Sequence, residues 1–235
     1  MAPLKPTSKR AGPGPRRAKR QTASSAEGAR EQLLDGAITL FAARGYEGVS
    51  TGEVAKEAGL TQSMVHYYFG SKASLWEAAV ERLMRRRSGQ FQVDISDLRD
   101  LDALSRLKVV IRRFVAANAT DPHLNRILIH EAMTSSARLE WLAVRFMRPG
   151  YQLFNQAIQD CIDAGLFRPV NARDVTNIIV GASTMTFSLS LLISEVYRDD
   201  PLGIDDADRL SDTLIDVLVR GLQVRPPVSP LPPSS

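Results

Sequence analysis

The chain has 235 residues, of which 44% are hydrophobic and 24% are charged; this composition excludes a collagen-like chain, a coiled-coil rod and a wholly disordered chain. Its single cysteine, Cys161, excludes a fold held by internal disulfides and favours a reducing compartment, so we expect a cytoplasmic protein. The net charge of +4 is unevenly distributed, because residues 1–24 carry seven basic side chains and no acidic one.

The amino-terminal segment, residues 1–26, is predicted to be a disordered basic tail. It is rich in proline and glycine, and it lacks the apolar periodicity that repays the entropy of folding. It also lacks the apolar stretch of a secretory signal. We favour an arm that contacts phosphates, with an organellar targeting segment and a solvated tail without function as the alternatives.

A first helix of about four turns is predicted next. The basic Arg44 followed by Gly45 is typical of a helix end. The apolar residues that recur at the spacing of one helix face are Leu33, Ala37, Ile38 and Phe41.

Two short helices joined by a tight turn form a helix-turn-helix pattern over residues 49–68. Ser50 and Glu53 have the spacing of a capping box, and Gly59 permits the turn. Thr61 is the expected N-cap of the third helix. Contacts between the two helices are expected from Val54, Leu60 and Val65. Many helix pairs share such a corner, so this pattern alone does not establish DNA binding.

A fourth helix is predicted to begin at Lys72, after the N-cap Ser71, and to extend past Arg87. Its second half carries a basic cluster of Arg82, Arg85, Arg86 and Arg87. We expect this cluster in the last turns, where positive charge stabilises the negative end of the helix dipole.

The stretch from Arg30 to Leu75 reads REQLLDGAITLFAARGYEGVSTGEVAKEAGLTQSMVHYYFGSKASL. It closely resembles the DNA-binding module of TetR-family transcriptional regulators. The resemblance rests on separated elements in the right order and spacing: the LF pair followed by GY, the capped second helix with Val54-Ala55, the AGL turn, Tyr67-Tyr68-Phe69 and Ser71-Lys72.

Helical spacing recurs along the whole chain without an alternating strand pattern, so the expected fold is all-α. The resemblance implies that residues 27–87 form the helix-turn-helix DNA-binding domain and that residues 88–224 form a helical domain for ligand binding and dimerisation. Residues 225–235 are predicted to be a proline-rich disordered tail. The family plan implies a homodimer whose third helices enter successive major grooves of a palindromic operator in double-stranded DNA.

The third helix divides by face. Val65 and Phe69 lie four residues apart and are expected to point into the core. Gln62 can pair with adenine, and Met64 can touch a thymine methyl group, whereas the polar groups around them are expected at phosphates. The candidate DNA-binding residues are Ser50, Thr51, Thr61, Gln62, Ser63, Met64, His66, Tyr67 and Lys72.

Two departures from the family pattern affect this interface. A tyrosine is usual where the chain has His66, and a histidine is common at Tyr68. The third helix also carries no lysine or arginine. We therefore expect the basic tail to supply non-specific affinity by following phosphates or entering a minor groove.

Further helices are predicted at residues 104–119, 124–134, 138–164, 172–197 and 206–222. Pro149-Gly150 is expected to kink the third of them. Residues 175–194 are uncharged and about as long as a membrane span, but they contain eight polar side chains, so we expect no membrane span. The alternative is burial between helices or across a subunit interface. The family plan favours a four-helix bundle made by the last two helices of each subunit.

The resemblance also implies a small-molecule effector, not identified by the sequence, that binds among the middle helices. Arg145 and Arg148 are either candidates for attracting an anionic ligand or solvated charges. The large or polar side chains that interrupt apolar helix faces are candidate ligand-binding residues, although core packing is an alternative for each: Phe114, Asn118, His130, Met133, Trp141, Phe146, Tyr151, Asn155 and Phe187.

Hydrolase, metalloprotease, phosphate-loop and calcium-loop motifs are missing from the sequence, so we expect no enzyme and no cofactor. His123 and His130 lack a third metal ligand in the sequence, and we expect no metal. Cys161 is expected to be an inert buried thiol rather than a redox sensor.

The resemblance implies a sequence-specific transcriptional regulator and, since repression is the common mode of the family, a repressor released from its operator by a small molecule. One alternative is an activator or a less specific DNA-binding protein. Another is a helical ligand-binding protein or enzyme with a degenerate DNA-reading unit. Discrimination between operator and random DNA separates these hypotheses, since a specific regulator prefers its operator by roughly 10³-fold or more.

Overall fold

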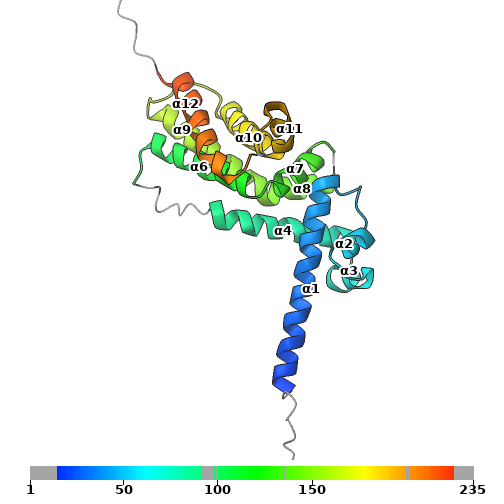
Figure 1. Cartoon of the computed structure of the whole chain (residues 1–235). Coiled ribbons are helices and arrows are strands. Elements are labelled where there is room, and N and C mark those ends of the chain that lie inside the picture. The colour runs from blue at the N-terminus through cyan, green and yellow to red at the C-terminus, as the bar shows by residue number, and fades with distance from the viewer. Residues whose placement is uncertain (1–14, 92–97, 99, 135, 200–201, 225–235) are drawn as a thin grey trace, which may run out of the picture.

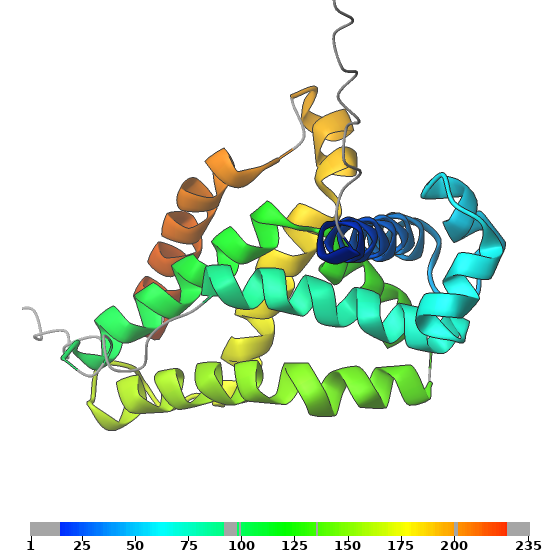
Figure 2. The ribbon, with the colours of Figure 1, turned by 90° about the horizontal axis from the view of Figure 1, so that it is seen from below.

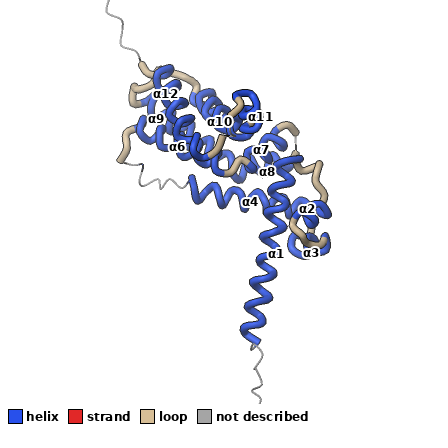
Figure 3. The backbone as a smooth tube through the Cα atoms, viewed as in Figure 1, coloured by secondary structure: helices blue, strands red, loops and turns tan. Residues whose placement is uncertain are grey.

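Helices and their connecting loops make up the part of the chain that the structure describes (Figure 3). The computed structural model describes residues 15–91, 98, 100–134, 136–199 and 202–224. An isolated β-bridge joins Phe167 and Gln223. The all-α expectation is confirmed, whereas most of the basic tail (residues 1–14) and the expected tail at residues 225–235 lie outside the described residues.

The first helix, α1, spans Pro15–Arg44 and projects from the molecule as a long rod (Figure 1). Its start differs from the expectation, because residues 15–26 are helical rather than disordered. Lysine, arginine, alanine and glutamine are strong helix formers, so the helix continues from its packed half toward the amino terminus. This part has no apolar pattern from which the sequence could predict a helix. The predicted end is confirmed, since Gly45 has φ +69°. The predicted buried face is also confirmed, with exposures of at most 3% for Leu33, Ala37, Ile38 and Phe41.

Three further helices complete a unit that we call the head: α2 (Thr51–Glu57), α3 (Gln62–Phe69) and α4 (Lys72–Phe91), packed on the carboxyl-terminal half of α1. The residues predicted to join α2 and α3 meet in one core, where Val54 and Val65 are fully buried and Leu60 packs against them. Gly59 has φ +67°, a conformation that side chains with a Cβ rarely adopt. The predicted helix-turn-helix is therefore present.

The basic cluster of α4 does not lie in the last turns as expected, because the helix continues to Phe91 and passes the predicted domain boundary at residue 87. Two of its arginines instead pair with α1. Arg82 and Arg86 donate to Asp35 at 3.1 and 2.9 Å, and Arg82 also contacts Glu31. Ion pairing between helices therefore replaces the dipole effect that we expected.

The remaining helices form the body, which begins with α6 (Ala103–Thr120) and α7 (His123–Ala132). The single helix expected over residues 138–164 is three consecutive pieces: α8 (Ala137–Leu142), a π-helix (Ala143–Met147) and α9 (Arg148–Asp163). Proline at position 149 cannot donate the hydrogen bond of a regular α-turn. The irregularity thus precedes the proline instead of forming a simple kink at Pro149-Gly150.

The helix expected over residues 172–197 is also divided, into α10 (Ala172–Ser188) and α11 (Ser190–Tyr197), which are bent by 71°. Thr186 and Ser188 donate their hydroxyls to backbone carbonyls four residues earlier, and such bonds bend helices. No single helix in the described part of the chain is long and apolar enough to cross a membrane, although this bent pair meets the criteria of length and composition. The last helix, α12 (Ala207–Leu222), follows a 3₁₀ turn.

The head and the body lie at opposite ends of the molecule, with α2 and α3 at one end and α12 at the other (Figure 2). One buried cluster fills the head and reaches α7 and α8, and a second fills the body between α6, α9, α10 and α12. The helix α4 packs against α1 in the head and against α6 and α7 in the body. It is therefore a direct mechanical connection between the two units.

Candidate nucleic-acid interface and interior cavity

The amino terminus of α2 is fixed by the predicted capping box. Glu53 N donates to Ser50 Oγ at 3.2 Å, and Ser50 N donates to Glu53 Oε2 at 2.8 Å. The bond from Ser50 N, a second bond from Ser50 Oγ to Glu53 Oε2 at 2.8 Å and the ion pair with Arg44 at 2.9 Å lower the pKa of Glu53 from 4.5 to about 2. Glu53 therefore stays ionised at neutral pH, and the remaining amides at this helix start are held in place.

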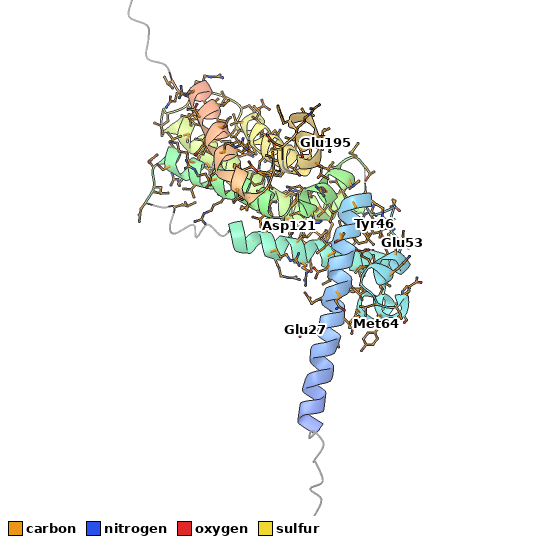
Figure 4. All side chains as sticks on the ribbon, viewed as in Figure 1. Glu27, Tyr46, Glu53, Met64, Asp121 and Glu195 are labelled. Atoms are coloured by element: carbon orange, nitrogen blue, oxygen red, sulfur yellow. The ribbon has the colours of Figure 1, made fainter. Side chains whose placement is uncertain are left out.

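The two faces of α3 are largely as predicted. Val65 and Phe69 are buried, and the exposed side chain of Tyr67 is 81% accessible. Met64 differs from the expectation, because it is half-buried and packs against the head core. Figure 4 shows Met64 and Glu53 in the head beside α1. The exposed face of α3 also presents Gln62, Ser63 and His66.

Several exposed polar side chains of the head are already bonded to one another. Gln62 Nε2 donates to Thr51 Oγ1 at 3.1 Å, which ties the start of α3 to the start of α2. Thr61 occupies the predicted N-cap position, but its hydroxyl lies 2.9 Å from that of Ser63 and makes no cap bond. The Gln62 amide keeps its oxygen and one N–H free for a base edge.

The imidazole of His66 is bonded within the head. Its Nδ1 lies 3.2 Å from the carbonyl oxygen of Gly70, so the Nδ1–H donates there. A neutral histidine has one N–H, and this bond uses it. Neutral His66 can therefore accept a bond at Nε2 but cannot donate one to a phosphate, which requires the protonated ring.

A hollow of about 700 Å³ lies between the starts of α2 and α4, and most of the predicted phosphate contacts line it together with Glu47 and Glu53, whereas Tyr67 does not. Lys72 Nζ lies 4.1 Å from the centre of the Tyr46 ring, a cation–π contact that positions the ammonium group. Tyr46 is a supporting residue that we did not predict, although the GY pair in the family motif marks it. The predicted residues that line the hollow are Ser50, Thr51, His66 and Lys72, and Ser71 joins them.

A second site is a cavity of about 800 Å³ in the body, which opens to solvent at Arg148 and Tyr151. Helices α4, α6, α7, α8, α9 and α10 line it together with the π-helix. Its size is in the range of pockets that enclose small molecules. Three predicted ligand-binding residues line it, namely Phe114, Phe146 and Tyr151.

The other six predicted ligand-binding residues do not line this cavity. Met133 is 83% exposed and His130 is also exposed, whereas Phe187 is buried in the body core. Trp141 packs against Trp76 in the head core, with ring centres 5.7 Å apart. The two remaining polar residues bond to other helices: Asn118 to Ser183 and Asn155 to Thr176. The four residues that are not exposed serve packing or contacts between helices, which the spacing alone could not distinguish from ligand binding.

Of the two arginines considered for an anionic ligand, Arg148 lines the cavity and Arg145 pairs instead with Glu81 at 2.9 Å. Arg87 and Asn125 also line the cavity and were missed. No local pattern marks them, since Arg87 belongs to a run of basic residues that otherwise face α1 or solvent.

The thiol of Cys161 is fully buried in the body core, as predicted. Burial, with the nearby charge of Asp160 as a smaller cause, raises its pKa to about 11. His123 bonds to Asp121 at 2.9 Å, and no cluster of three metal-ligating side chains occurs among the described residues.

Comparison with known proteins places both units in one family. The family model described as "Bacterial regulatory proteins, tetR family" matches residues 33–79, and the one described as "Tetracyclin repressor-like, C-terminal domain" matches residues 104–218. The chain belongs to the TetR family. This TetR-family protein is a DNA-binding transcriptional regulator whose helix-turn-helix is formed by α2 and α3.

Curated relatives of this TetR-family chain are likewise described as transcriptional regulators. The HTH-type transcriptional regulator AcrR of Shigella flexneri is 26% identical over 150 residues, which are 62% of this chain and 69% of that protein. The HTH-type transcriptional regulator SrpR of Pseudomonas putida is 23% identical over 167 residues, which are 71% of this chain and 76% of that protein.

Solved structures show that the TetR fold extends over most of the chain. The hemolysin II transcriptional regulator HlyIIR aligns with a TM-score of 0.62 at 21% identity, covering 81% of this chain and 99% of that one. AibR, solved in complex with isovaleryl coenzyme A and operator DNA, aligns with a TM-score of 0.62 at 19% identity, covering 80% and 97%.

Proposed function

We propose that this TetR-family regulator is a repressor that binds a palindromic operator as a homodimer and leaves it when a small molecule enters the cavity of the body. The observation that carries the proposal is the single helix α4. It begins with Lys72 beside the hollow of the head and lines the cavity fifteen residues later with Arg87. A helix of its 20 residues is about 30 Å long.

Two relatives support the sign of regulation and the ligand response. The regulator IcaR of Staphylococcus aureus, described as a negative transcriptional regulator, is 35% identical over 52 residues, which are 22% of this chain and 28% of that protein. The AibR structure contains both a small molecule and operator DNA. The proposal involves no catalytic step, and it places the regulator in the cytoplasm with the DNA that it reads.

In this proposal the head divides its contacts between bases and phosphates. Gln62 and Ser63 reach base edges from the start of α3, with Met64 beside them at a thymine methyl group. The phosphate contacts come from the hydroxyl and ammonium groups around the hollow and from Tyr67. The hydrogen bond from the Gln62 amide to Thr51 couples the base contacts to the phosphate contacts, because it holds the Gln62 side chain against α2, the helix that lies on the DNA backbone.

The proposed dimer surface is formed by α10, α11 and α12. These helices expose large apolar side chains that a water-soluble monomer rarely leaves in contiguous patches. Packing α10 and α12 against the same helices of a second copy gives a four-helix bundle. The exposed apolar residues are Ile178, Met185, Leu189, Leu191, Leu192, Val196, Tyr197 and Val217.

The coupling follows from how α4 is held. At its start Leu75 and Trp76 are buried in the head core, and Tyr46 lies between Lys72 of α4 and Arg138 of α8, with the guanidinium carbon 3.7 Å from the ring centre. A ligand that moves the cavity end of α4 therefore changes the position of the head. Such coupling is reciprocal, so operator DNA and the effector weaken each other by the same factor.

The test is selection of random duplex DNA by the purified protein at about 150 mM salt, because salt sets the non-specific background. We expect a palindromic motif from the wild type and its loss from the Gln62→Ala/Tyr67→Ala double variant. The matched control is Gln159→Ala, which removes an amide from the exposed face of α9 and should recover the same motif. Enrichment of no motif by folded, dimeric protein contradicts the proposal.

A further inference from the structure

The wall of the interior cavity has an unusual charge balance. Most of its lining is aliphatic, aromatic or methionine side chain, and Met84, Leu128 and Val180 are typical of it. Two arginines line it, Arg87 and Arg148, but no aspartate or glutamate does so among the described residues. The cavity is thus apolar with positive charge at its edge, and it disfavours a cationic ligand.

Arg87 is partly buried and is held in place by neutral groups. Its Nη2 donates to Asn118 Oδ1 at 2.6 Å, and its Nη1 donates to Asn125 Oδ1 at 3.3 Å. The guanidinium carbon lies 5.1 Å from the centre of the Phe114 ring, which also lines the cavity. Asn118 in turn donates to Ser183 of α10 at 2.6 Å. The guanidinium therefore has a fixed position at the junction of α4, α6, α7 and α10.

Among the described residues, no aspartate or glutamate forms an ion pair with the Arg87 guanidinium, although its neighbour Arg86 pairs with Asp35. Asp121, which Figure 4 labels, is the acid that acts on Arg87 through its charge, but it bonds to His123 at 2.9 Å and lies 4.0 Å from Arg86. Burial lowers the pKa of Arg87 to about 10.

A positive charge in this position has a clear chemical preference. A guanidinium has five N–H donors, and the two carboxamides take two of them. A carboxylate bonds a guanidinium through charge-assisted hydrogen bonds that are stronger than those from neutral groups. A charge that is removed from water without a counter-charge destabilises a protein. A ligand that supplies the counter-charge relieves this cost, which adds to its binding free energy.

We propose that the cavity binds an amphipathic carboxylate, with the carboxylate group on Arg87 and the apolar body among the aliphatic and aromatic side chains of α4, α7, the π-helix and α10. The binding site does not depend on DNA recognition. The assignment of this ligand as the effector rests on the proposed function. A carboxylate on Arg87 also competes with Asn118 and Asn125 for its N–H groups, which loosens the attachment of α4 to α6 and α7.

The binding experiment uses three probes with the same twelve-carbon chain and different headgroups: dodecanoate, dodecanol and dodecyltrimethylammonium, each below its micelle concentration. Isothermal titration of the full-length dimer is expected to give at least about tenfold tighter binding of dodecanoate than of dodecanol, which corresponds to one charge-assisted contact. The cationic probe is expected to bind most weakly. Equal affinities for dodecanoate and dodecanol overturn the proposal.

Two substitutions on α4 locate the charge that makes this distinction. Arg87→Gln is expected to lower the dodecanoate affinity to that of dodecanol without changing the dodecanol affinity. Arg85→Gln is the matched control, because the Arg85 side chain lies two residues away and is 66% exposed, and it should behave as wild type. An equal loss in both variants overturns the assignment to Arg87. Arg87→Lys keeps the charge and is expected to retain part of the preference if Arg87→Gln fails to fold.

A third substitution tests that the chain lies in the cavity. Leu128→Trp fills space in the lining and is expected to weaken dodecanoate and dodecanol by similar factors, whereas unchanged binding of both overturns the placement. The two proposals fail separately. If dodecanoate is preferred and no operator motif is selected, the repressor function is wrong and the ligand site stands. If a motif is selected and dodecanoate is not preferred, the ligand site is wrong and the repressor function stands.

Discussion

The head and the body of this regulator use polar side chains in different ways. In the helix-turn-helix of the head, polar contacts are made near the surface by residues close together in the chain, as between Ser50 and Glu53. In the body, the polar network around Arg87 lies deeper and joins distant segments: Arg87 and Asn118 are 31 residues apart, and Asn118 and Ser183 are 65 apart. A substitution on the head surface therefore changes which DNA sequence is recognised, whereas one inside the body disturbs several helices at once.

The largest expected effect comes from removing an aromatic ring in the body. Phe154 is 1% exposed and packs edge-on against Phe114 at 5.3 Å. Phe154→Ala is expected to lower the free energy of unfolding by about 3–5 kcal/mol. Tyr67→Ala, which removes an exposed ring from the head, should change it by less than about 0.5 kcal/mol. Urea unfolding measures both, and similar losses would break the comparison.

The basic tail is expected to give the next largest effect, on DNA affinity rather than stability. Replacing the seven lysines and arginines of residues 1–24 with glutamine removes the positive charge that α3 does not supply. We expect operator affinity to fall about tenfold or more, and the slope of log K against log salt to decrease by about 0.9 for each phosphate that the tail no longer neutralises. The Gln62→Ala variant is the control, with lower specificity and a preserved slope. An unchanged slope in the tail variant rejects the arm.

Loss of the capping box is expected to have a smaller, local effect. Ser50→Ala should cost about 1 kcal/mol of stability, as for other N-caps, and raise the pKa of Glu53 from about 2 toward 4.5. In the wild type, the stabilisation linked to this depressed pKa is present above pH 4.5 and is lost as the pH falls through about 2. Carboxyl titration by NMR measures the shift. Ser63→Ala, whose hydroxyl caps nothing, should leave the Glu53 pKa unchanged.

The smallest effect is expected for an exposed ion pair in the body. Arg112 donates to Asp212 at 2.8 Å, and the two side chains are 49% and 65% exposed. Arg112→Ala should change the free energy of unfolding by less than about 0.5 kcal/mol, because solvent screens such pairs. A loss above about 1 kcal/mol would show that sensitivity in the body does not depend on burial.

The head could be predicted in detail because its determinants are local. The capping box needs two residues three apart, the turn needs a glycine at one position, and the inward face of α3 needs Val65 and Phe69 four apart. Each of these is visible in a short window of sequence. The exceptions also have local causes, such as the Thr61 hydroxyl that bonds Ser63 instead of capping α3.

The cavity could be predicted only in part, because its lining comes from helices far apart in the chain. Periodicity marks a side chain as inward-facing, but it does not tell whether the residue meets a cavity or another helix. Phe114 and Phe187 have the same pattern, yet one lines the cavity and the other fills the core. From the sequence, Arg87 looks like one more charge near a helix end. Its partners Asn118 and Asn125 lie 31 and 38 residues further along the chain, too far for a local pattern to reveal them.

The burial of Cys161 makes the chain a convenient background for distance measurements. Its thiol has a pKa of about 11, and only a thiolate attacks thiol-modifying reagents, so this residue stays unmodified near neutral pH. A cysteine introduced at the exposed position Glu57 on α2 would then be the single reactive thiol in each subunit. A pair of spin labels at these positions would measure the separation of the two heads of a dimer directly, with and without a ligand in the cavity.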